Sequence, residues 1–162
     1  MIARFGVLVC VVASTACASS GAARIATGSV SRWTGSFRPA ASGSSAVLAP
    51  VTPNRGAGSI IINALGGAPA RMRVDLSVSG APPSAQVAWA VFSGPCGSTA
   101  PMLAGQNEFP PISVSSSGDG HIQTDMAFAL DPRAAYHANV YSTSRANDMN
   151  DVMMCANLKP EG

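Results

Sequence analysis

The stretch Trp89-Ala90-Val91-Phe92-Ser93-Gly94-Pro95-Cys96 has the pattern of a buried β-strand that runs into a tight turn. Its apolar side chains alternate between two faces, with Val87, Trp89 and Val91 on one and Ala88, Ala90 and Phe92 on the other. A strand that is apolar on both faces is typical of the inside of a sheet. The stretch therefore predicts a central strand, followed by a turn that places Cys96 at its end.

The composition around this stretch favours short strands joined by many turns. The chain has 162 residues, of which 47% are hydrophobic and only 11% are charged, with 16 glycines and 12 prolines. This length predicts a single domain, and so many glycines and prolines disfavour long helices. The net charge is +2 and the ten Lys and Arg residues are scattered, which argues against a nucleic-acid partner.

Short strand patterns recur along the chain from residue 31 onward. The clearest is 71–79, where Met72, Val74, Leu76 and Val78 alternate with polar residues, as in a half-buried antiparallel strand. Residues 116–120 (Ser-Ser-Gly-Asp-Gly) predict a hairpin turn, and 131–135 predict a single helical turn. The other predicted strands are 31–38, 58–65, 86–94, 112–115, 121–130, 136–144 and 152–158, with a possible short one at 46–48. We therefore expect an all-β domain of seven or eight strands, an antiparallel β-sandwich or Greek-key barrel.

The N-terminus has the features of a cleaved export signal. Arg4 is followed by an apolar run over 5–13 and by Ser14-Thr15-Ala16, a small-residue cleavage region. The run is too short for a membrane span, which needs about 20 apolar residues. The alternative interpretation is a buried N-terminal helix. We predict that residues 1–16 are a signal peptide.

Cys17 follows directly, and together with Ala16 it resembles a bacterial lipobox. The match departs at Ser14, where the lipobox normally has an aliphatic residue. We expect Cys17 to carry lipid, 17–29 to be a flexible tether to the membrane, and 30–162 to form the β-sandwich domain. A secreted soluble protein without the lipid is the alternative.

The number of cysteines agrees with this division. Cys10 leaves with the signal peptide, and lipidation of Cys17 leaves Cys96 and Cys155. Two thiols that remain in an exported protein most simply form a disulfide. Closing a loop of about 59 residues would stabilise the fold by about 4 kcal/mol in the chain-entropy model.

Three segments in order carry a family resemblance. They are Trp89 to Cys96, the Gly-Asp-Gly hairpin at 118–120 with Tyr-His-Ala-Asn-Val-Tyr-Ser at 136–142, and Met-Met-Cys-Ala-Asn-Leu at 153–158. Together they resemble small exported bacterial proteins of the copper/zinc superoxide dismutase-like superfamily, and less closely chordin-type domains. The resemblance covers about residues 30 to 160. It implies the superoxide dismutase-like Greek-key fold and a disulfide between Cys96 and Cys155.

The resemblance does not extend to the metal ligands. Where the family has a His-x-His pair this chain has Ala90 and Phe92, and where a further copper histidine is expected it has Tyr141. Alanine and phenylalanine cannot bind copper. We therefore expect no metal, no cofactor and no catalytic residue. The alternative is a divergent metal-binding protein or dismutase that recruits His121, His137 and an acidic residue.

The geometry of the family that the chain resembles would place a possible contact patch where copper binds in that family. The patch consists of Phe92, His137, Asn139 and Tyr141, beside Ala90. Aromatic rings next to polar groups suit contact with an envelope protein or a small ligand. The competing interpretation is that Phe92 and Tyr141 pack under the loop after Cys96. The predicted function is a lipid-anchored lipoprotein of the bacterial cell envelope, on the periplasmic side or the cell surface, that acts as a non-catalytic binding or structural module.

Overall fold

The computed structural model describes residues 31–40, 56–67, 69–144 and 151–161. The predicted signal peptide (1–16), the lipidation site Cys17, the tether (17–29) and the possible strand at 46–48 lie outside the described residues. Among the residues described, no helix is both long and apolar enough to cross a membrane.

The described chain is almost entirely β-structure, as the sequence predicts. It includes one short 3₁₀ turn with defined bounds, η1 (Gln106–Glu108), and no α-helix among the described residues. The strands are β1 (Arg32–Pro39), β2 (Ala57–Ala64), β3 (Met72–Ser79), β4 (Gln86–Val87), β5 (Trp89–Ser93), β6 (Ile112–Ser113), β7 (Gly120–Met126), β8 (Tyr136–Tyr141) and β9 (Val152–Glu161).

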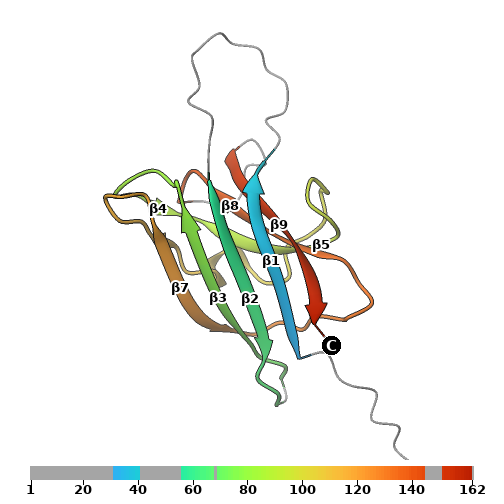
Figure 1. Ribbon diagram of the computed structural model, residues 1–162. Coiled ribbons are helices and arrows are strands. Elements are labelled where there is room, and N and C mark those ends of the chain that lie inside the picture. The colour runs from blue at the N-terminus through green and yellow to red at the C-terminus, as the bar shows by residue number, and fades with distance from the viewer. Residues whose placement is uncertain (1–30, 41–55, 68, 145–150, 162) are drawn as a thin grey trace, which may run out of the picture.

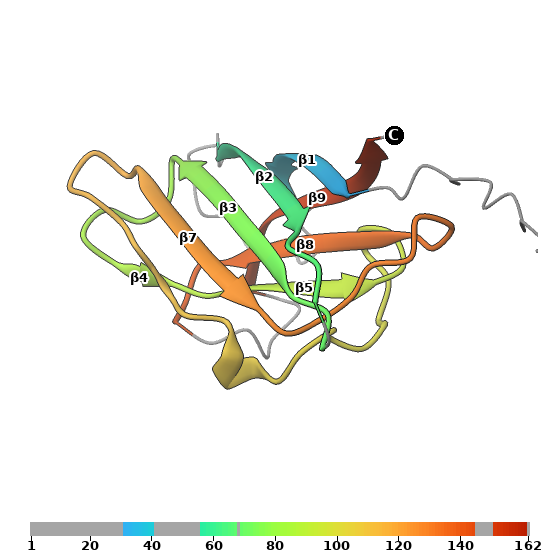
Figure 2. The same cartoon turned by 90° about the horizontal axis from the view of Figure 1, so that it is seen from below.

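Seven strands form one antiparallel sheet in the order β5-β8-β9-β1-β2-β3-β7, and β4 pairs with β6 in a small second sheet. The large sheet is curled, so that β1, β2, β3 and β7 face β5 and β8 across the interior (Figures 1 and 2). The all-β antiparallel sandwich or barrel is thus confirmed.

Alternating side chains of both layers fill the space between them. From β3 the core receives Met72, Val74, Leu76 and Val78, all at most 4% exposed, as the alternation predicts. From the opposite layer it receives Trp89, whose ring contacts Phe109 edge-on and whose indole N–H donates to the carbonyl of Pro110 at 2.8 Å. Large side chains that meet in this way exclude water from the interior and stabilise the fold.

The prediction of one central strand over 86–94 is wrong in two respects. The segment breaks at Ala88 into β4 and β5, and β5 is the end strand of the large sheet. Both of its faces are nevertheless buried, and a loop covers its free edge. Leu103 N–H donates to the Val91 carbonyl at 2.9 Å, and Ser93 N–H donates to the Pro101 carbonyl at 3.2 Å.

The predicted hairpin turn is present, and the predicted helical turn is only a hydrogen-bonded turn. Gly118 N–H donates to Ser115, and residues Val114 and Gly120 pair across the hairpin. At 131–135, the Ala134 N–H donates to the Asp131 carbonyl at 3.0 Å, but no helix forms. The Asp131 side chain caps this turn by accepting from the Arg133 N–H at 2.8 Å.

Candidate functional site

A disulfide joins the turn after β5 to the last strand. Cys96 and Cys155 are bonded, with their Cα atoms 6.0 Å apart. The Asn157 side-chain oxygen accepts a hydrogen bond from the Cys96 N–H at 2.8 Å, and the Gly94 carbonyl accepts one from His137 Nδ1 at 2.9 Å. These contacts hold the turn against the outer face of β8 and β9.

The predicted contact patch comes together on that face, but it is not an open surface. The paired residues Phe92 and His137 stack with their ring centroids 5.1 Å apart, and Asn139 and Tyr141 follow at alternate positions of β8. Phe92 is 6% exposed, and the other three are at most 1% exposed. The patch is therefore corrected to a buried layer, in part because the turn from Gly94 to Cys96 packs onto it.

This buried layer contains polar groups without partners. A carbonyl oxygen can only accept, so His137 Nδ1 is the protonated nitrogen, and Nε2 is buried with no hydrogen-bond partner. Burial lowers the pKa of His137, although the hydrogen bond to Gly94 partly opposes this shift. Burial raises the pKa of Tyr141, and the nearby Asn139 amide slightly opposes it. Neither Asn139 side-chain atom has a partner within hydrogen-bond geometry among the described residues.

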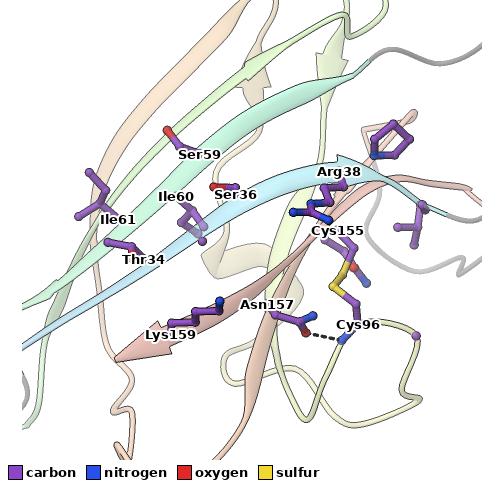
Figure 3. A pocket seen from close by; sticks show the side chains of 16 residues that line it. Thr34, Ser36, Arg38, Ser59, Ile60, Ile61, Cys96, Cys155, Asn157 and Lys159 are labelled. Carbon is purple, nitrogen blue, oxygen red and sulfur yellow. Dashed lines mark hydrogen bonds between the residues drawn. A yellow bond between two sulfur atoms is a disulfide. The ribbon is translucent and has the colours of Figure 1, made fainter. Parts of the chain in front are cut away.

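Next to this layer, a groove with a volume of about 870 Å³ lies on the outer surface of β1, β2 and β9. Figure 3 shows its lining, with the disulfide at one side and the Asn157–Cys96 hydrogen bond beside it. The lining residues are Thr34, Gly35, Ser36, Arg38, Pro39, Ala40, Ser59, Ile60, Ile61, Cys96, Gly97, Asn139, Val152, Cys155, Asn157 and Lys159. A cavity of this size suits a small organic ligand.

Asn139 connects the buried layer to the groove. Its amide is 1% exposed, lines the groove, and has an oxygen and a nitrogen without hydrogen-bond partners. Buried amides are nearly always hydrogen-bonded, because burying one alone costs about 1–3 kcal/mol. Asn139 therefore borders the groove as a buried group and not as an exposed contact.

The two histidines of the alternative metal site are in different surroundings. The His121 side chain is 58% exposed on β7, with Nε2 at 3.1 Å from an oxygen of Asp75, whereas His137 is buried on β8. Within the described segments, no three His, Cys, Asp or Glu side chains come together as metal ligands would. No observation therefore favours a metal site built on these histidines.

The sequence pattern missed the groove itself. The groove is lined by polar residues of strands in which polar and apolar residues alternate, and nothing in the sequence sets these residues apart from ordinary exposed ones. They are Ser36, Arg38, Asn157 and Lys159. Neither a protein-family model nor a curated protein matches this chain.

Proposed function

We propose that the protein is an exported, lipid-anchored lipoprotein of the bacterial cell envelope, with a superoxide dismutase-like β-sandwich that acts as a non-catalytic binding module. The observation that carries the binding role is the groove of about 870 Å³ on the outer surface of β1, β2 and β9, which is lined by the polar residues Arg38, Asn157 and Lys159.

The non-catalytic assignment is supported by the residues at the positions where the resemblance requires copper ligands. Ala90 and Phe92 offer no donor atom, and the Tyr141 hydroxyl is buried with its pKa raised, which disfavours the phenolate that would bind a metal. The disulfide from the turn after β5 to β9 is the pairing that the resemblance implies. It also suits export, because disulfides persist in oxidising compartments.

Cell fractionation tests the anchored lipoprotein. The natural chain is expected in the membrane fraction, and Cys17→Ser is expected to move it to the soluble exported fraction. Cys10→Ser is the matched control, because Cys10 lies within the predicted signal peptide and its loss leaves the anchor intact. Unchanged fractionation of Cys17→Ser, or an equal shift of Cys10→Ser, would contradict the lipid anchor.

Metal analysis of the purified chain tests the non-catalytic module. After incubation with copper or zinc and removal of the excess, less than a stoichiometric amount of metal is expected to remain. Stoichiometric retention that is lost in His137→Ala would contradict the proposal and favour a divergent metal-binding protein.

A further inference from the structure

The geometry points to a specific ligand class for the groove: a small organic molecule with one oxyanion group, either phosphate or carboxylate, which binds between Arg38 and Lys159. This inference rests on the proposed binding function and adds the chemistry of the ligand. Three observations carry it: two cations without ion-pair partners, an oriented amide between them, and a lining that lacks acidic side chains.

Arg38 and Lys159 are the cations of the groove. They project from neighbouring antiparallel strands, Arg38 opposite Cys155 and Lys159 opposite Thr34, and their side chains point toward each other along the groove (Figure 3). Neither has an ion-pair partner among the described residues, whereas Arg32 and Arg73 pair with Glu161 and Asp125. Two cations at one site, without a counter-charge, attract an anion.

Asn157 places a further donor between the two cations. Its side-chain oxygen is engaged by the Cys96 N–H, which leaves the NH₂ end of the amide free to donate to a ligand. On β1, Ser36 lies midway between Arg38 and Thr34 and adds a hydroxyl to the same stretch of the groove. An oxyanion accepts several hydrogen bonds at once, so these donors suit it better than they suit a cation or a neutral amine.

The Glu161 carboxylate does not oppose an anion. No described residue that lines the groove is acidic. Glu161 lies two positions beyond Lys159 on β9, but its carboxylate is paired with Arg32 at 2.9 Å and accepts from the Thr34 hydroxyl at 2.8 Å. Its charge is therefore already balanced at the end of the groove.

The rest of the lining fits the uncharged part of such a ligand. Pro39, Ile61 and Val152 contribute apolar surface. A bare inorganic ion would fill little of the 870 Å³ and would leave the apolar lining surface exposed to water. We therefore expect an organic body attached to the anion.

Calorimetric titration of the soluble Cys17→Ser chain at low salt tests this inference. Phenyl phosphate and benzoate are the anionic probes, and phenol is the neutral one. At least one anion is expected to bind at one per chain, more tightly than phenol. Arg38→Gln and Lys159→Gln are each expected to weaken that binding about tenfold, the effect of losing one charge-assisted hydrogen bond. The stronger of the two anions identifies the phosphate or the carboxylate as the preferred group.

Arg133→Gln is the control, because it removes the same charge from a turn outside the groove. The inference is overturned if neither anion binds, if phenol binds as well as the anions, or if Arg133→Gln weakens binding as much as Arg38→Gln. The titration and the fractionation of Cys17→Ser are independent measurements. A failure of the anion to bind is therefore distinguishable from a failure of the lipid anchor.

Discussion

Removal of the disulfide is expected to cost a large part of the stability of the domain. The double variant Cys96→Ala and Cys155→Ala opens a loop whose ends are 59 residues apart in sequence. In the chain-entropy model a cross-link over this span stabilises the folded state by about 4 kcal/mol. Small domains have total unfolding free energies of about 5–15 kcal/mol, so the variant should unfold at a much lower denaturant concentration.

Urea unfolding of the soluble Cys17→Ser chain, followed by tryptophan fluorescence, measures this loss. Asn157→Ala provides the comparison, because it removes the hydrogen bond to the Cys96 N–H and keeps the disulfide, at a cost of about 1 kcal/mol. Addition of reductant should lower the stability of the natural cysteine pair to that of the double variant. A loss in the double variant below about 1 kcal/mol would refute the reasoning that this cross-link constrains the unfolded chain.

Three further predictions concern the buried layer and the core. Because burial lowers the pKa of His137, the unfolded chain binds more protons below about pH 6.5. The unfolding free energy should therefore fall as the pH drops from about 6.5 to the lower folded pKa, and His137→Asn should remove this part of the pH dependence in urea titrations; an identical profile would contradict it. Gly58→Ala should cost about 1–3 kcal/mol in urea unfolding, because the new Cβ would overlap the Ser77 carbonyl oxygen, whereas Ser59→Ala should change stability by less than about 0.5 kcal/mol. Equal effects would contradict that packing argument. Trp89→Phe should cost about 2 kcal/mol or more, since it leaves the Pro110 carbonyl without its donor and opens space beside Phe109, and a neutral thermal melt would count against it.

Local patterns in the sequence predicted the elements whose side chains alternate regularly. β3 is the clearest case, because its four buried apolar residues alternate strictly with polar ones that are exposed or half-buried. The hairpin before β7 was predictable for a similar reason, since the glycines and serines at 116–120 favour a tight turn. Both features depend on residues close together in the chain.

Features that depend on distant segments were predicted less well. The predicted strand over 86–94, which is apolar on both faces, was assigned to the middle of the sheet. In the structure β5 is an end strand, and its edge is covered by Pro101 to Leu103. Burial of both faces indicates that something packs on each face, and it does not indicate whether a strand or a loop lies along the edge. The residues of the predicted patch were correctly grouped, and the competing interpretation anticipated the burial of Phe92 and Tyr141. The burial of His137 and Asn139 was missed.

The groove could not be predicted, because its two halves are separated by more than a hundred residues. Arg38 on β1 and Lys159 on β9 become neighbours only through the antiparallel pairing of the first and last strands. Along each strand they are exposed polar residues that alternate with buried ones, like many others in the chain. Only their position around one groove, whose described lining residues include no acidic side chain, distinguishes them.

The most direct measurement of the ligand site is an NMR titration of the nitrogen-15-labelled Cys17→Ser chain with phenyl phosphate and benzoate. We expect the chemical shifts of the backbone amides of β1 around Arg38 and of β9 around Asn157 to change and to reach a plateau as the anion is added. The side-chain amide signals of Asn139 and Asn157 should change with them. The amide signals of β3 and β7, the two strands at the opposite end of the sheet from β5, should not shift. Shifts confined to β3 and β7, or no saturable shift with either anion, would contradict a binding site in this groove.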